Sequence, residues 1–161
     1  MPDGLALFHA THANLQGTAV AFDSAALSTA RVLLRKQQAN KEGYLGLEPK
    51  FLIVGPERET VAETLLSAGA LIKTATGEAP NPSWISRLTL VVDPRINANS
   101  MYLLASPAQI DTYEFAELEG ENGPVVETKT DFEVDQFALK VRYVCGGAWV
   151  DFRGAVKVSL I

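Results

Sequence analysis

The sequence predicts an α+β protein with a mostly antiparallel sheet. Two segments of the first half have the spacing of amphipathic helices, and a continuous apolar run between them is typical of a buried strand. The second half is a succession of short strand-like segments separated by turns. Helices and strands therefore do not keep alternating as they would in a doubly wound parallel sheet.

The first half contains both predicted helices. Residues 1–22 show no sustained period and are expected to form a loose lead-in. Asp23 and Ser24 offer N-cap oxygens to a helix over residues 25–39, which ends in a basic turn. Residues 50–54 predict a strand buried on both faces, and Pro56 opens a second helix that ends near Gly69.

The remaining chain is predicted to be strands and loops. Prolines and a glycine make residues 74–83 a surface loop, because proline neither continues a helix nor joins a central ladder. Strands are expected at residues 87–92 and 101–105, completing a helix and strand region over residues 23–112. A β-meander then fills residues 113–161, with Gly146 and Gly147 as a break between strands.

Composition limits the function classes. A chain of 161 residues with 47% apolar and 20% charged residues is expected to fold as one globular domain. The net charge of −5 disfavours nucleic acid as a direct partner. No apolar run is long enough to span a membrane, and no basic signal-peptide region is present. The single cysteine, Cys145, is expected in the core of a protein folded in the cytoplasm.

Few residues have the spacing of a chemical site. His9 and His12 have the spacing of two zinc ligands, but a closed site needs two more, and Cys145 is the remaining Cys or His. Hydrogen bonding within the lead-in is the favoured role of both histidines. No Gly-x-Ser-x-Gly elbow is present to support a nucleophile.

Three carboxylates and two tryptophans stand out among the other residues. Glu117, Glu119 and Glu121 alternate, so on one strand they would project to the same side, facing either solvent or the cations of another subunit. Trp84 is expected to pack its loop down or to anchor an interface. Trp149 is expected in the core.

Several segments together resemble the Mu-like major head subunit family of tailed bacteriophages, which is often fused to a Clp-type prohead protease. The matching segments follow one another through nearly the whole chain. They are Leu7-Phe8-His9-x-x-His12-x-Asn14-Leu15, Ala26-Leu27-Ser28-x-Ala30-Arg31, Leu47-x-Pro49-x-Phe51-Leu52-Ile53-Val54, Tyr102-Leu103-x-Ala105-x-Pro107, Glu117-Leu118-Glu119-Gly120-x-x-Gly123-Pro124 and Asp151-x-Arg153-Gly154.

The resemblance implies a Hong Kong 97-like capsid subunit, with an axial domain and part of the peripheral domain's long strands. It implies the C-terminal portion of such a subunit, a truncated chain or a prophage remnant, since no counterpart of the N-terminal arm, extended loop and spine helix precedes Leu7. The implied role is a shell assembled around five-fold and six-fold axes in the bacterial host cytoplasm and carried in the virion. The implied partners are further copies and other phage head proteins, with no enzyme activity, metal or cofactor.

The expected subunit contacts lie in the loops over residues 40–49 and 74–84 and in the acidic strand. The candidate contact residues are Tyr44, Glu48, Glu78, Trp84, Arg87, Glu117, Glu119 and Glu121. One alternative is a small metal-binding or hydrolytic domain that uses His9, His12 and the cluster from Glu117 to Glu121. Another is a phage adaptor or tail-associated interaction domain.

Overall fold

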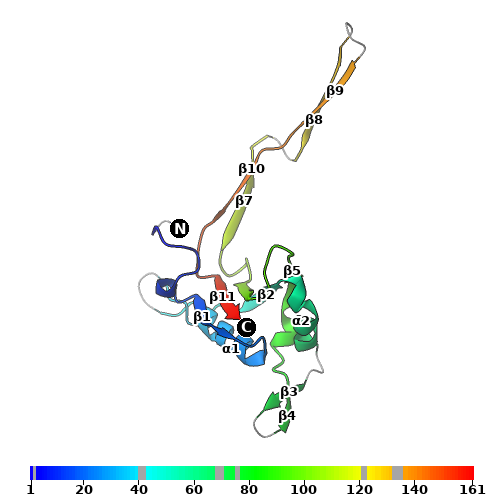
Figure 1. Cartoon of the computed structure of the whole chain (residues 1–161). Coiled ribbons are helices and arrows are strands. Elements are labelled where there is room, and N and C mark those ends of the chain that lie inside the picture. Colours follow the sequence, from blue (N-terminus) through cyan, green and yellow to red (C-terminus); the bar gives the residue numbers. More distant parts are fainter. Residues whose placement is uncertain (2, 40–42, 68–70, 75–76, 121–122, 132–135) are drawn as a thin grey trace. The chain divides into compact units, whose positions relative to one another are not determined.

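A computed structural model of the chain describes residues 1, 3–39, 43–67, 71–74, 77–120, 123–131 and 136–161 (Figure 1). The chain forms two compact units, which are described separately. Unit 1 comprises residues 1–112 and 151–161, and unit 2 comprises residues 113–150.

Unit 1 is built on a five-stranded sheet. The two inner pairings are antiparallel, whereas each edge strand pairs in parallel with its neighbour. The strands lie in the order β1 (Leu15–Val20), β11 (Ala155–Leu160), β6 (Ser100–Ala105), β2 (Pro49–Val54) and β5 (Thr89–Val92). Leu103 of β6 lies opposite both Leu52 of β2 and Val156 of β11, so the register brings large apolar side chains of neighbouring strands together.

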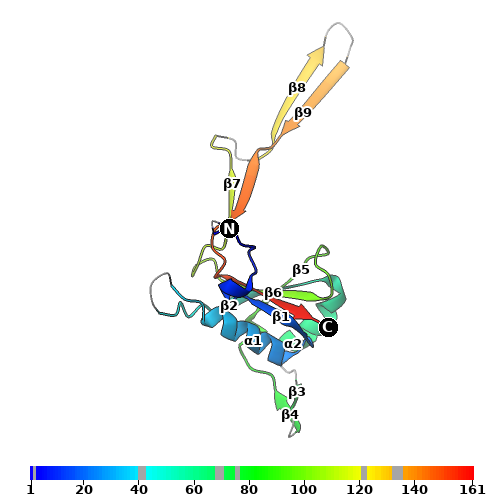
Figure 2. The same ribbon diagram turned by 60° about the vertical axis from the view of Figure 1, so that its left-hand side comes forward.

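Two helices cover one side of this sheet (Figure 2). They are α1 (Ser24–Arg35) and α2 (Glu59–Leu66). The Asp23 carboxylate caps α1 by accepting a hydrogen bond from Ala26 N at 2.8 Å. The buried residues of the helices and every second residue of the inner strands form one apolar cluster. Its fully buried large side chains include Leu27, Leu34, Leu52, Val54, Ile85, Met101, Leu103, Val156 and Val158.

Buried polar side chains fix the N-terminal segment to unit 1. Asn14 is fully buried, and its Nδ2 donates to the Leu7 and Phe152 carbonyl oxygens at 2.9 and 3.2 Å. Gln37, just after α1, donates to the carbonyl oxygens of His12 and Ala13, which lie in and after the 3₁₀ helix η1 (Ala10–His12). These bonds pair backbone carbonyl oxygens of the segment and of Phe152, so buried amide side chains tie the N-terminal segment to the rest of unit 1.

Shorter elements complete unit 1. Two 3₁₀ helices, η2 (Pro56–Arg58) and η3 (Ile85–Arg87), precede α2 and β5. A separate antiparallel hairpin is formed by β3 (Leu71–Thr74) and β4 (Gly77–Pro80).

Unit 2 consists of two antiparallel ladders nested in the chain, together called the arm below. The outer ladder pairs β7 (Tyr113–Glu117) with β10 (Cys145–Trp149). The inner ladder pairs β8 (Val125–Asp131) with β9 (Gln136–Arg142). Each ladder has two strands, so no strand of the arm lies in a wider sheet within the described residues.

The structure confirms a mixed α+β protein, with two α-helices in the part of the chain that it describes. Among the strand pairings of the described residues, five are antiparallel and two are parallel, so the predicted predominance of antiparallel pairing is also confirmed. The predicted first helix and the strand from residue 50 correspond to α1 and β2.

Several local predictions were wrong. The expected lead-in over residues 1–22 contains β1, because its backbone pairs with β11 near the other end of the chain. The expected loop over residues 74–83 contains β4, since Pro80 sits at the end of a two-stranded hairpin rather than in a central ladder. In place of a meander, β7 pairs with β10 around the inner ladder, and β11 joins the sheet of unit 1.

Two residues expected in the core are exposed. Trp149 is 43% exposed, and Cys145 is exposed as well. Both lie in β10, where Gly146 and Gly147 continue the strand rather than break it. The cause is that β10 belongs to a two-stranded ladder, and the described residues of unit 2 form no second layer that covers it.

Gly55 gives a direct test of the packing after β2. A Cβ atom at this position would lie 2.3 Å from the Ile96 carbonyl oxygen, so backbone must move to admit it. We expect Gly55→Ala to lower the free energy of unfolding by about 1–3 kcal/mol in urea titrations. Gly17→Ala is the matched control, since nothing lies within 4 Å of its Cβ position. The control should be at least as stable as the wild type, and equal stability of both variants would contradict the packing.

Candidate functional site

A cationic cleft of about 160 Å³ opens between the C-terminal half of α1, the start of β2 and η3. Its lining residues are Arg31, Arg35, Glu48, Pro49, Lys50, Trp84 and Arg87. Arg31 and Arg35 share one face of α1 because they are four residues apart. Four cationic side chains thus converge with one carboxylate in a chain whose net charge is −5.

The aromatic ring of Trp84 organises this cleft. The Arg31 guanidinium lies over the ring, with Cζ 4.7 Å from the centroid. Trp84 itself packs partly buried against the apolar cluster of unit 1, which fixes the position of Arg31. Arg35 is held separately by the Glu48 carboxylate, with Nη2 and Oε1 2.5 Å apart.

The cations of the cleft are not fully compensated. Burial lowers the pKa of the Arg31 guanidinium, and the nearby charges of Arg35 and Arg87 lower this pKa further, whereas Glu48 raises it. Arg31 Nε is buried and has no hydrogen-bond partner among the described residues. Glu48 is already bound by Arg35, so the cleft favours an additional anionic group from outside.

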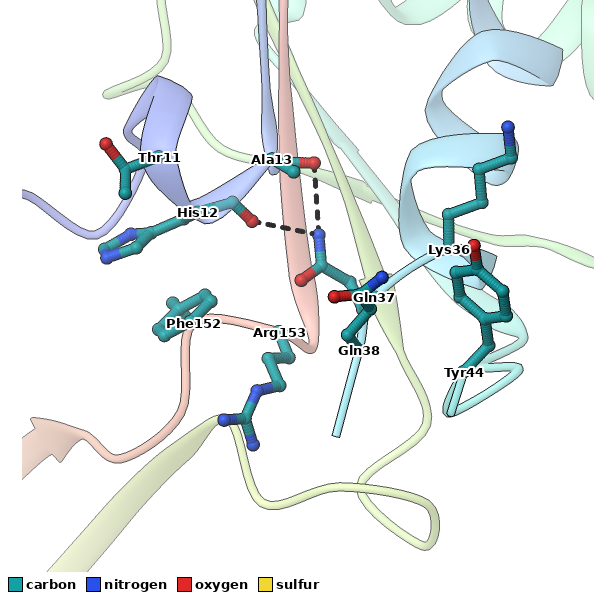
Figure 3. A pocket seen from close by; sticks show the side chains of 9 residues that line it. All are labelled: Thr11, His12, Ala13, Lys36, Gln37, Gln38, Tyr44, Phe152 and Arg153. Atoms are coloured by element: carbon teal, nitrogen blue, oxygen red, sulfur yellow. Dashed lines mark hydrogen bonds between the residues drawn. The ribbon is translucent and has the colours of Figure 1, made fainter. Parts of the chain in front are cut away.

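A second pocket, of about 420 Å³, lies between η1, the end of α1 and the start of the C-terminal segment of unit 1 (Figure 3). The His12 ring forms one wall and stacks on Phe152, with centroids 3.9 Å apart and an interplanar angle of 11°. Lys36 and Arg153 also line the pocket, but their side chains point away from each other (Figure 3). The pocket therefore lacks the convergent charge of the cationic cleft.

Both histidines have structural partners, as the sequence favoured. His12 is buried, and its ring nitrogens lie 3.1 Å from the Leu7 carbonyl oxygen and 2.6 Å from Asp3 Oδ2. The bond to His12 lowers the pKa of Asp3. His9 Nδ1 accepts a hydrogen bond from Thr11 N at the start of η1. Within the described residues, no three His, Cys, Asp or Glu side chains form a group that could hold a metal ion.

The inner ladder of the arm has one apolar and one charged face. Side chains directly opposite each other in an antiparallel pair share a face, so Val126 and Val141 lie together, as do Thr128 and Leu139. The residues Val126, Phe137, Leu139 and Val141 are 57–67% exposed. The opposite face carries charges, including the ion pair of Lys140 Nζ with Glu127 Oε2 at 2.9 Å.

The outer ladder presents aromatic side chains on one face. Tyr113 and Trp149 are cross-strand neighbours, with ring centroids 5.2 Å apart and nearly perpendicular planes. Phe115 lies on the same face opposite Gly147, and the Tyr113 hydroxyl occupies the space that a Cβ of Gly147 would need. The three aromatic rings are 43–57% exposed, so this face is also uncovered within unit 2.

The structure brings some of the predicted contact residues together. Glu48, Trp84 and Arg87 meet in the cationic cleft, and Tyr44 lines the second pocket. Glu117 and Glu119 belong to unit 2, and Glu78 lies in β4 opposite Lys73. Glu121 and residues 40–42 lie outside the described residues.

Sequence reasoning missed two groups of residues. The first is Arg31 and Arg35, whose four-residue spacing indicates a shared helix face but does not reveal Trp84 nearby. The second is the apolar face of the inner ladder. Alternation of Phe137, Leu139 and Val141 with Ala138, Lys140 and Arg142 is the signal that would have identified it.

A family model described as phage capsid protein matches residues 2–158. The chain belongs to the phage capsid protein family. Membership in the phage capsid family indicates a structural protein of the phage capsid. No curated protein matches the chain. No helix among the described residues combines the length and the apolar character needed to cross a membrane.

Solved structures resemble the chain at low identity. A phage-related protein from Bordetella bronchiseptica is similar with a TM-score of 0.60 and 13% identity, over 94% of this chain and 54% of that one. The procapsid of satellite phage P4 with its size determination protein is similar with a TM-score of 0.44 and 12% identity, over 91% of this chain and 42% of that one. The holo encapsulin complex of Synechococcus elongatus is similar with a TM-score of 0.49 and 14% identity, over 91% of this chain and 52% of that one. The chain thus spans about half the length of these structures.

Glu117 and Tyr143 join the two ladders and give a pH test of the arm. The Tyr143 hydroxyl donates to Glu117 Oε1 at 2.5 Å, which raises the pKa of Tyr143 from 10.0 to about 12. Because the folded pKa is raised, this contribution to stability is complete below about pH 10 and is lost as the pH rises towards about 12. Ultraviolet titration should therefore show one tyrosine that ionises late.

Glu117→Gln should return this ionisation towards the ordinary tyrosine pKa of about 10, because the acceptor loses its charge. Tyr143→Phe serves as the assignment control and should remove the late transition. A late transition that persists in Tyr143→Phe would contradict the assignment.

Proposed function

We propose that the chain is part of a structural subunit of a tailed-phage or prophage major capsid, and that copies contact one another to form the head shell. Its membership in the phage capsid family supports the structural role. Both units would act together as the single capsid-like domain that the sequence predicts. The Mu-like relationship, the Hong Kong 97-like fold, the C-terminal position in a longer subunit and the protease fusion belong to this proposal.

The uncovered apolar face of the arm carries the proposal. A ribbon of two strands is marginally stable by itself in water, and this ribbon exposes Val126, Phe137, Leu139 and Val141 on one side. Exposed apolar patches with a polar surround mark interaction surfaces. The partner we assign to this face is another copy of the chain, since a shell is built by repeating the same contacts between many copies.

The contact residues predicted from the sequence extend the proposal to unit 1. Glu48, Trp84 and Arg87 would contact neighbouring copies through the cationic cleft, while Tyr44 and Glu78 would do so from their own loops and strands. Glu117, Glu119 and Glu121 would contribute acidic contacts from the arm. Such contacts would recur around the five-fold and six-fold axes of the shell. Other phage head proteins would be further partners. The shell would assemble in the host cytoplasm and be carried in the virion.

The apolar face can be tested by mutation. Phe137→Ser with Leu139→Ser removes two large apolar side chains, each contributing about 1.5–3 kcal/mol when fully buried. The variant should therefore need at least about tenfold higher concentration than the wild type to associate. Size-exclusion chromatography with light scattering over a concentration series measures this change.

The matched control alters the charged face of the same strands. Glu127→Ser with Lys140→Ser removes both partners of an exposed ion pair and should leave association within about threefold of the wild type. Thermal unfolding of both variants checks that unit 1 stays folded. A wild-type chain that remains monomeric at every concentration, or equal weakening by both variants, would refute the role of the apolar face.

A further inference from the structure

The cationic cleft and the acidic strand β7 have complementary charge. We propose that the carboxylates of β7 and the turn after it, on one copy, dock into the cationic cleft of a second copy. This inference rests on the proposed assembly role and names the surfaces that meet. It concerns contacts between copies and adds to the apolar face described above.

The cleft is lined by more cationic side chains than its one carboxylate can pair with. Lys50 and Arg87 are exposed and form no ion pair with another described residue, and Arg31 Nε is buried without a hydrogen-bond acceptor among the described residues. The Trp84 ring holds the Arg31 guanidinium in place from one side. A guanidinium fixed in this way can bind a carboxylate with little further loss of side-chain freedom.

The acidic strand and the residues after it carry an excess of negative charge. Residues 113–124 include Glu114, Glu117, Glu119 and Glu121 and no Lys or Arg. Glu114 and Glu119 are exposed and form no ion pair within the described part of the chain. On its face of the ladder Glu114 is accompanied by Ala116, Ala148 and Gly146, so small neighbours leave its carboxylate free to approach another surface.

Dimensions favour a carboxylate over a nucleic-acid backbone. A cleft of about 160 Å³ with Glu48 in its wall admits a side-chain carboxylate, whereas phosphate backbones are followed by broad basic surfaces. The chain also has a net charge of −5, which repels a polyanion at long range. An acidic strand of a second copy, which brings a few carboxylates at separated positions, is the better match.

Charge reversal on each side tests the pairing. The cleft variant is Lys50→Glu with Arg87→Glu, which leaves the contact between Arg31 and Trp84 in place. The arm variant is Glu114→Lys with Glu119→Lys, which leaves the hydrogen bond between Glu117 and Tyr143 in place. Each variant alone should associate at least about tenfold more weakly than the wild type at low salt, because like charges then meet. Sedimentation velocity measures this association.

A mixture of the two variants provides the decisive readout. The reversed cleft of one variant is complementary to the reversed strand of the other, so the mixture should associate within about threefold of the wild type. Added salt should weaken the wild type and the mixture alike. Controls that change charge away from both surfaces are Lys36→Glu, and Glu57→Lys with Glu63→Lys. Each control variant, measured without a second variant, should associate as strongly as the wild type.

The outcomes separate this pairing from the assembly role. If the wild type associates and reversal of the cleft has no effect, the pairing is overturned while assembly stands. If the mixture associates no better than either variant alone, the pairing is likewise overturned. If the cleft variant loses binding of a short duplex DNA but associates normally, the cleft is a phosphate site and the pairing is wrong. If no combination associates, both the pairing and the assembly role fail.

Discussion

A two-stranded ribbon has two faces and no second layer of its own to cover either. This constraint makes the burial of apolar side chains differ between the two units of the chain. In unit 1 the apolar sides of β2, β6 and β11 are covered by α1 and α2, and their large side chains are removed from water. In unit 2 the same alternation of apolar residues leaves Phe137, Leu139 and Val141 exposed. The apolar surface that the arm cannot bury is what another copy would have to cover.

Apolar and charged contacts would have different tasks in an assembly. Burial of the apolar face would supply most of the association free energy, since the hydrophobic effect scales with the area removed from water. The charged surfaces would select the partner and its register, because like charges brought together are penalised. Trp84 takes part in both kinds of contact. Its ring packs on the core of unit 1 and also holds the Arg31 guanidinium in the cationic cleft.

Local patterns in the sequence predicted the helices, and tertiary pairings accounted for the errors. Asp23 before an apolar period of 3.6 residues defined α1 without further information. By contrast, β1 contains Gly17 and little β-branched alternation, and its strand state depends on β11 near the other end of the chain. Gly146 and Gly147 indicated a break, yet the Tyr113 ring lies over Gly147 and the strand continues. Periodicity shows which side of a strand is apolar but not what covers it, which is why the sequence predicts Trp149 in the core although the structure exposes it.

Hydrogen exchange measured on dispersed and associated protein tests most directly whether the arm is covered by another copy. Backbone amides of β8 and β9 should exchange rapidly in dilute monomer and become protected on association, whereas those of the buried strand β6 should be slow in both states. Equal exchange of β8 and β9 in the two states would show that association takes place elsewhere and would contradict the account.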